Sequence, residues 1–166
     1  MTRAVLALGA NLGDRFGSLQ AALDELARQL PVLAVSSVYE TVAVGGPVQP
    51  DFLNAVVIVG LPDDVDLLGV LRAVESAGGR SRGVRWGPRS IDVDVVSVAD
   101  RRSADPALTL PHPRVAERAF VLVPWVEVDP AATLPGLGPV AGLAAARQSL
   151  GVRRRPDLVL RKPAAR

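Results

Sequence analysis

The chain has 166 residues and a formal net charge of +2; 49% of its residues are hydrophobic and 22% are charged. This length suits a single domain, and the composition is that of a folded protein rather than a disordered one. The absence of cysteine excludes disulfide scaffolds, thiol catalysis and cysteine-ligated zinc, and the single histidine, His112, excludes a multi-histidine metal site.

The first part of the chain alternates between strand and helix patterns. Residues 3–9 form a short apolar run that ends in a glycine-rich turn, which is typical of a buried strand. Apolar residues then recur every three or four positions over residues 16–30 and predict a helix, which Pro31 ends. Residues 32–39 are rich in β-branched side chains and predict a second strand, whereas residues 41–51 contain too much glycine and proline for a regular element.

The pattern then repeats. Residues 52–61 predict a buried strand, and Asp63 is the expected N-cap of an amphipathic helix that ends at the glycine pair 78–79. Residues 80–89 are expected to form a loop, and residues 91–98 predict a further strand.

The last third of the chain has weaker patterns. Residues 120–128 favour a strand interrupted by Pro124, and residues 140–150 favour a short helix. The preceding order of strand, helix, strand, strand, helix, strand predicts an α+β fold with a ferredoxin-like βαββαβ antiparallel sheet. We expect its helices to pack on one face, with additions at the C-terminus.

Basic residues gather in two places. Residues 151–166 hold six basic side chains against one acidic one, so the rest of the chain carries a small negative excess. We therefore expect one domain over residues 1–150, a basic and mobile tail over 151–166, and no nucleic-acid partner. No apolar run reaches the roughly 18 residues of a membrane span, and no signal-peptide pattern is present, so we expect a cytoplasmic monomer without a membrane partner.

Two acidic residues share one face of the strand predicted over residues 91–98. Alternate residues of a strand point the same way, so Asp92 and Asp94 project together, with Cα atoms about 6.6 Å apart, while Val93 and Val95 face the core. Such a pair favours a cation, and magnesium takes one or two carboxylates and completes its shell with water and phosphate oxygens. A bare Asp-x-Asp is also typical of a solvated strand edge. The four arginines upstream, between residues 80 and 89, favour a metal–polyphosphate site instead.

Two further segments hold candidate ligands. His112 lies between two prolines and either orders its loop or donates to a phosphate, depending on whether the fold brings it to Asp92 and Asp94. Phe52 and Asn54 share a strand face, and an amide in an apolar strand needs a partner. A planar heteroaromatic ligand could stack on the ring and bind the amide.

The chain resembles the 6-hydroxymethyl-7,8-dihydropterin pyrophosphokinase family of folate biosynthesis over roughly residues 3–135. The matching segments, in chain order, are ALGANLGD (7–14), VYET (38–41), QPDFLNA (49–55), GRSRGVRWGPRSIDVD (79–94), LPHP (110–113) and RAFVLVP (118–124). The resemblance implies a ferredoxin-like enzyme that transfers the pyrophosphoryl group of ATP to the hydroxymethyl oxygen of the pterin and releases AMP.

The resemblance also implies roles for individual residues. Asp92 and Asp94 would hold two magnesium ions, and Arg80 and Arg89 would act with them in catalysis. The implied ATP contacts are Glu75, Arg82, Trp86, Arg89, Val95, Thr109, His112 and Arg118. The implied pterin contacts are Thr41, Val44, Phe52, Asn54 and Phe120.

Two rival functions fit parts of the sequence. RNA-recognition domains share the element order and use basic loops, but they stack bases on aromatic residues of the central strands, and residues 4–9 contain none. A regulatory relative that binds nucleotide without turnover is the other alternative. The presence of Asp92, Asp94, Arg80 and Arg89 argues against it.

Overall fold

The computed structural model describes residues 1–42, 48–78, 91–147 and 151–164. Its elements, in chain order, are β1 (Thr2–Ala10), α1 (Arg15–Gln29), β2 (Val32–Val35), β3 (Tyr39–Thr41), β4 (Phe52–Leu61), α2 (Leu67–Gly78), β5 (Asp92–Val98), the 3-10 turn η1 (Val115–Glu117), α3 (Ala119–Val128), β6 (Thr133–Leu134), β7 (Gly138–Pro139), α4 (Val140–Ala145) and β8 (Val152–Arg154). The main sheet has the order β5-β1-β4-β3-β8, and β2 also pairs with β4. Every one of these pairings is antiparallel.

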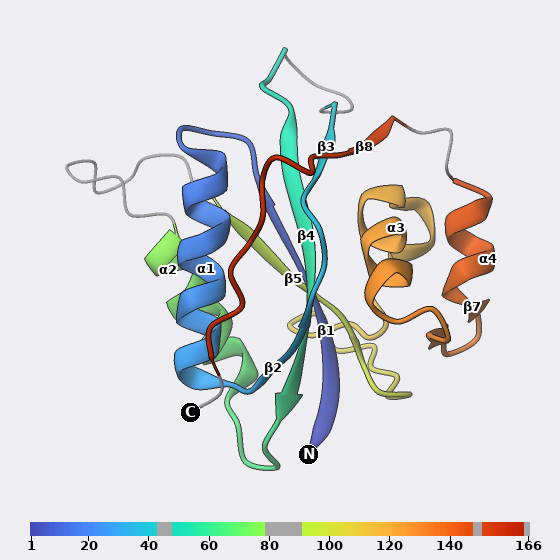
Figure 1. Ribbon diagram of the computed structural model, residues 1–166. Helices are drawn as coiled ribbons and strands as arrows, with labels where there is room; N and C mark the ends of the chain where they lie inside the picture. The colour runs from blue at the N-terminus through green and yellow to red at the C-terminus, as the bar shows by residue number, and fades with distance from the viewer. Residues whose placement is uncertain (43–47, 79–90, 148–150, 165–166) are drawn as a thin grey trace.

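Helices cover both faces of this sheet (Figure 1). Alternate residues of β1 separate into two cores: Leu6 and Leu8 pack with α1 and α2, whereas Val5 packs with α3 and α4. We expected helices on one face only. The second layer arises because β4 is apolar at every position from Ala55 to Val59, so both of its faces require cover.

Capping residues set the start of the two long helices. The Asp14 side chain accepts a hydrogen bond of 2.9 Å from the Gly17 backbone N–H at the start of α1. Asp66 accepts one of 3.0 Å from Gly69 at the start of α2. The cap of α2 is therefore Asp66 and not Asp63, because the chain between them makes a turn before the helix begins.

Two predicted strands differ from the structure. The strand expected over residues 32–39 is divided into β2 and β3 at Ser36, whose hydroxyl accepts from the Val56 N–H at 2.8 Å and replaces a ladder bond. The prediction of a strand over residues 120–128 is wrong, because this segment lies in α3. All of its residues except Glu127 are apolar, because α3 is buried between the sheet and α4, so the segment lacks the amphipathic period that identifies a helix.

The C-terminal segment packs against the domain. The helix predicted over residues 140–150 is shorter and ends at Ala145. Where we expected a mobile tail, β8 pairs with β3, and Leu160 is buried in the core beneath α1. Gln20 of α1 exchanges hydrogen bonds with the backbone of Arg161. The segment thus extends one edge of the sheet and then runs along the layer that contains α1 (Figure 1).

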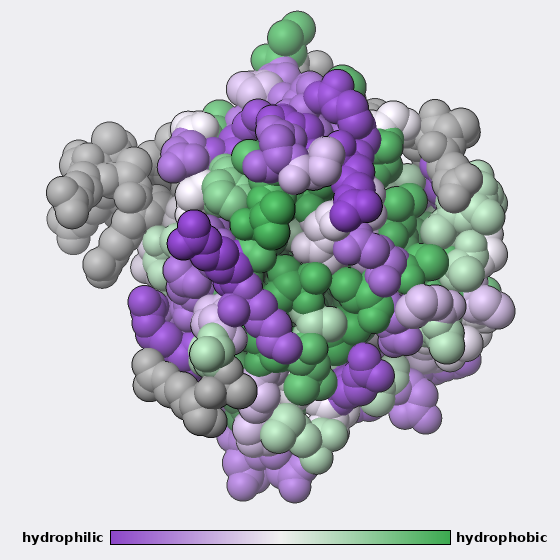
Figure 2. Space-filling model, in the orientation of Figure 1, coloured by the Kyte–Doolittle hydropathy of each residue, from purple (hydrophilic) through white to green (hydrophobic). Residues whose placement is uncertain are grey.

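The surface is not uniform in polarity. Apolar residues form a band down the middle of the view in Figure 2, between the two helical layers, and polar residues dominate the upper end, where β3 and β8 lie. No helix in the described ranges is both long and apolar enough to cross a membrane.

Candidate functional site

One strip of the sheet carries the candidate residues on the same face as α3. In the strand register Gly9 lies opposite both Asn54 and Asp92, and Ala7 lies opposite Asp94. These residues form two short rows across β4, β1 and β5. A Cβ built on Gly9 would lie within 4 Å of only Asn54 and Phe52 among the described residues, so no described side chain of α3 or α4 lies over this glycine.

The two aspartates lie on one side of β5, as the alternation predicts. Asp92 is exposed and Asp94 half-exposed, whereas Val93 and Val95 between and beside them are buried in the core of α1 and α2. Arg118, at the start of α3, binds the Asp94 carboxylate with 3.1 Å between Nη1 and Oδ2. The strip therefore holds acidic oxygens with a guanidinium group directly beside them.

His112 lies next to this pair. Together with Ala7, Val96, Val115 and Val121, the side chains of Asp94, His112 and Arg118 line a narrow crevice. The His112 backbone N–H donates to the Val96 carbonyl at 2.8 Å, which attaches the preceding loop to β5.

The protonation of His112 follows from its surroundings. Burial lowers the pKa of His112 below its usual value, the charges of Arg118 and Arg114 lower it further, and Asp94 opposes them. Nδ1 of His112 accepts a hydrogen bond of 3.1 Å from the Arg114 N–H, which assigns the proton of the neutral ring to Nε2. At neutral pH, His112 therefore offers an uncharged N–H donor beside Asp94.

A buried amide forms the other half of the strip. Asn54 is 4% exposed, and its Nδ2 donates to the Thr41 hydroxyl at 2.9 Å. Phe52 precedes it on the same face of β4, next to Thr41 in the register. Phe120 belongs to the first turn of α3, with the Arg118 guanidinium 5.6 Å from the centre of its ring. The amide and the Phe52 ring are thus placed together as the sequence predicts.

The remaining predicted contacts lie farther apart. Glu75 of α2 accepts a long hydrogen bond of 3.5 Å from the Val93 N–H at the start of β5. The Thr109 hydroxyl donates to the Asp105 carbonyl at 3.0 Å in the loop before His112. The side chain of Val95 is buried in the core beneath α1 and α2, which leaves only its main chain for a ligand. Five of the predicted residues fall outside the described residues: Val44, Arg80, Arg82, Trp86 and Arg89.

Sequence reasoning missed a charged network on the opposite face of β3. Glu40 is 7% exposed and binds Arg15, Arg153 and Arg155. A hint was present in the sequence, because Glu40 lies between Tyr39 and Thr41 in a strand, where a charged residue on the inner face needs a partner. Its partners come from distant segments and could not be identified without the fold.

A larger cavity of about 760 Å³ lies at the opposite end of the sheet, where β1 begins. Arg3, Ser97, Trp125 and Asp129 contribute to its lining. None of the residues predicted to bind ATP or the pterin line it, so the candidate site is the strip above and not this cavity.

Comparisons with known proteins find matches over most of the chain. The model of the 7,8-dihydro-6-hydroxymethylpterin-pyrophosphokinase (HPPK) family matches residues 5–130. The chain is 47% identical over 150 residues to the 2-amino-4-hydroxy-6-hydroxymethyldihydropteridine pyrophosphokinase of Mycobacterium leprae, covering 83% of this chain and 78% of the relative. It is 43% identical over 139 residues to the enzyme of the same name from Methylorubrum extorquens, covering 82% and 88%.

A solved structure supports the fold. The crystal structure of HPPK-DHPS from Plasmodium falciparum with pteroate superposes with a TM-score of 0.68 at 16% identity. The match covers 89% of this chain but only 43% of the longer Plasmodium chain. At this identity the likeness concerns the fold alone.

Proposed function

The chain belongs to the 7,8-dihydro-6-hydroxymethylpterin-pyrophosphokinase family, and from this premise we propose how its open strip of sheet carries out the reaction. It transfers the pyrophosphoryl group of ATP to the hydroxymethyl oxygen of 6-hydroxymethyl-7,8-dihydropterin, a step of folate biosynthesis, and releases AMP. The observation that carries the residue assignment is the shared strip, in which a pair of carboxylates on β5 and a buried amide on β4 share one face, with β1 between them.

The sheet belongs to the ferredoxin-like class in this proposal. The order β5-β1-β4, with β2 and β3 both on the far side of β4, supports it, as does the packing of α1 and α2 together on one face. The layer of α3 and α4 is then an addition to that core, and it covers the part of the second face around Val56 and Ile58 and leaves the strip around Gly9 for substrates.

Asp92 and Asp94 would hold magnesium. Among the described residues no group of three or more acidic or histidine side chains forms a metal cage, and the two aspartates are the acidic pair on the strip. This donor set fits magnesium, which needs one or two carboxylates and takes its other ligands from water and phosphate. Bound there, magnesium would neutralise phosphate charge and orient the polyphosphate.

The triphosphate would lie between the carboxylates and the start of α3. One N–H of the Arg118 guanidinium already binds the Asp94 carboxylate. A phosphate oxygen next to that carboxylate would accept hydrogen bonds from the remaining N–H groups of Arg118. The neutral His112 ring would donate a hydrogen bond from its Nε2–H to a phosphate oxygen without adding positive charge. By their match to the family, Arg80, Arg82 and Arg89 would contact the phosphates, with Arg80 and Arg89 balancing their charge during the transfer. Trp86, Glu75 and Thr109 would contact the nucleotide.

The pterin would occupy the half of the strip around Asn54. A pterin edge presents both donors and acceptors, and Asn54 offers a carbonyl oxygen that points toward Gly9. Phe52 and Phe120 would stack on the ring system, while Thr41 fixes the orientation of the amide. Val44 would complete the pocket by its match to the family.

In the transfer itself, the hydroxymethyl oxygen forms a bond to the β-phosphorus of ATP. The bond from that phosphorus to the α,β-bridging oxygen breaks, so AMP leaves with the electron pair, and the hydroxyl proton passes to solvent. No strong general base lies on the strip among the described residues, and phosphoryl transfer relies mainly on positioning and electrostatic stabilisation. The strip contributes by aligning the two substrates and balancing charge around them.

Asparagine substitutions test the assignment of the acidic pair. Asp92→Asn and Asp94→Asn keep the size of each side chain and remove its charge, so turnover, measured as AMP release, should fall by about two orders of magnitude or more. Asp63→Asn removes one exposed carboxylate before α2 and is the matched control. Circular dichroism should show all three variants folded. Wild-type turnover by folded Asp92→Asn and Asp94→Asn at saturating magnesium would refute the assignment.

A further inference from the structure

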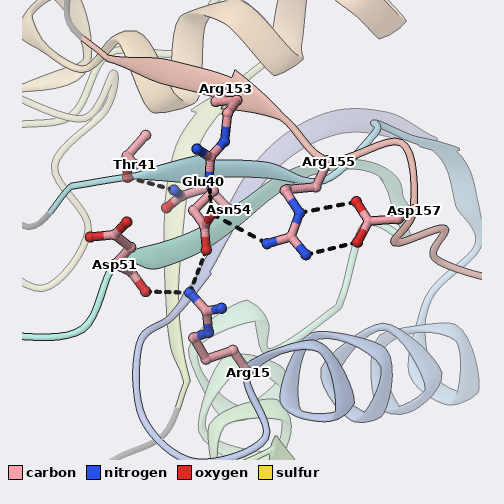
Figure 3. Close-up of polar contacts among 8 residues, drawn as sticks. All are labelled: Arg15, Glu40, Thr41, Asp51, Asn54, Arg153, Arg155 and Asp157. Carbon is pink, nitrogen blue, oxygen red and sulfur yellow. Dashed lines mark hydrogen bonds and ion pairs between the residues drawn. The ribbon is translucent and has the colours of Figure 1, made fainter.

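A buried carboxylate joins three distant parts of the chain behind the proposed pterin pocket. Glu40, in the middle of β3, accepts from Arg15 at 2.7 Å through one oxygen. Its other oxygen accepts from Arg153 and, at 3.2 Å, from Arg155. Figure 3 shows the carboxylate between Arg15, which starts α1, and the two arginines of the C-terminal segment.

The charge of this carboxylate is held in place by its partners. Burial opposes the ionisation of Glu40, but hydrogen bonds from Arg15 and Arg153 and the charges of Arg15 and Arg155 outweigh it and lower the pKa of Glu40. Arg155 itself forms a bidentate ion pair with Asp157, in which Nε donates to Oδ1 at 3.0 Å and Nη2 donates to Oδ2 at 2.7 Å. Networks of this kind fix geometry strongly when every member is satisfied.

The same network touches both strands that carry the pterin residues. Thr41 is the next residue after Glu40 on β3 and accepts from Asn54 on the opposite face of the sheet. Nη1 of Arg15 donates both to Glu40 and, at 2.8 Å, to the carbonyl of Asp51. Asp51 immediately precedes β4, so a single guanidinium group ties the middle of β3 to the residue before β4 (Figure 3).

The C-terminal arginines reach the network because β8 adds to the sheet edge. Glu40 lies opposite Arg153 in the β3–β8 register, and the Arg155 N–H donates to the Val38 carbonyl at 2.8 Å. These arginines lie beyond residues 5–130, the part that the family model matches. The C-terminal segment thus supplies two of the three arginines that bind Glu40 on β3, the strand that carries Thr41.

We propose that Glu40 is a positioning residue for the pterin substrate, and that the C-terminal segment acts on the reaction through it. The network fixes the spacing between Thr41 and Asn54 from behind, without touching either substrate. The inference rests on the proposed function, because it takes that half of the strip as the pterin pocket.

The test is steady-state kinetics on the full-length protein, with the pterin and ATP varied separately. Glu40→Gln keeps the shape of the side chain and removes the charge, and Arg155→Met removes one cation. Coupled groups in such networks contribute enough to change binding about tenfold. We expect the KM for the pterin to rise by about that factor and the KM for ATP to change less than twofold.

Arg161→Met is the control for the arginine variant. Arg161 belongs to the same C-terminal segment, and its side chain is exposed and takes no part in the ion pairs of Glu40. The same loss of one positive charge there should leave both KM values unchanged. If Glu40→Gln fails to fold, Arg153→Met gives the same test, since the Arg153 side chain is 70% exposed and its loss opens no cavity.

A double variant separates positioning from general damage. If Arg155 acts through Glu40, adding Arg155→Met to Glu40→Gln should raise the pterin KM by less than twofold more. Three results would each overturn the inference: effects of the two substitutions that multiply independently, equal rises in the KM values for the pterin and ATP, or wild-type kinetics in Glu40→Gln. If instead the wild-type chain releases no AMP with the pterin and ATP, the proposed function fails.

Discussion

Gly9 offers a direct test of the space in which the pterin is placed. A methyl group at this position would lie 3.4 Å from Oδ1 of Asn54 and 3.9 Å from the Phe52 ring, both within ordinary contact. Gly9→Ala should therefore fold without strain. Replacing a strand glycine by alanine stabilises by about 0.5–1 kcal/mol, which in a chain of this length raises Tm by about 1–4 °C.

The same methyl group would stand in the middle of the strip, between Asn54 and Asp92. Crowding a fitted site costs about 1–3 kcal/mol, or about 5- to 150-fold in kcat/KM for the pterin. Calorimetry and steady-state kinetics on one preparation measure both effects. Gly142→Ala, at a helix position of α4 with open space around it, is the control and should leave kcat/KM unchanged. Wild-type kcat/KM in Gly9→Ala would show that no substrate uses this space.

Two further predictions concern protonation and folding. The folded-state pKa of His112 lies below its usual value, so the free energy of unfolding should decline as the pH falls below that usual value. An NMR titration should show that Asp94→Asn lowers this pKa and that Arg118→Met raises it. Shifts of the opposite sign would contradict the electrostatic account. Ser36→Ala should cost about 1–3 kcal/mol in urea unfolding, because it leaves the buried N–H of Val56 without the hydroxyl that accepts from it. A loss below about 0.5 kcal/mol would show that the backbone compensates.

Local patterns predicted the parts of the fold that depend on neighbouring residues. The alternation around Asp92 and Asp94 gave the correct face for both carboxylates, and the apolar run over residues 52–61 matches β4 in both of its bounds. These features follow from strand geometry, which places every second residue on one face.

Features that depend on distant partners could not be predicted in the same way. Residues 120–128 are apolar except for Glu127, and their burial between the sheet and α4, not a local pattern, accounts for the helix. The basic composition of the C-terminal segment is typical of a solvated tail, yet Arg153 and Arg155 fold back onto Glu40. A charge pattern cannot reveal a counter-ion more than 100 residues away.

The central claim is that this chain moves a pyrophosphoryl group between its two substrates, and the fate of the β-phosphate tests it most directly. The wild-type protein would be incubated with magnesium, 6-hydroxymethyl-7,8-dihydropterin and ATP labelled at the β-phosphorus, and the products separated. The account predicts that the label appears on the pterin as a diphosphate, in equal amount to unlabelled AMP. Labelled ADP together with a pterin monophosphate would contradict it.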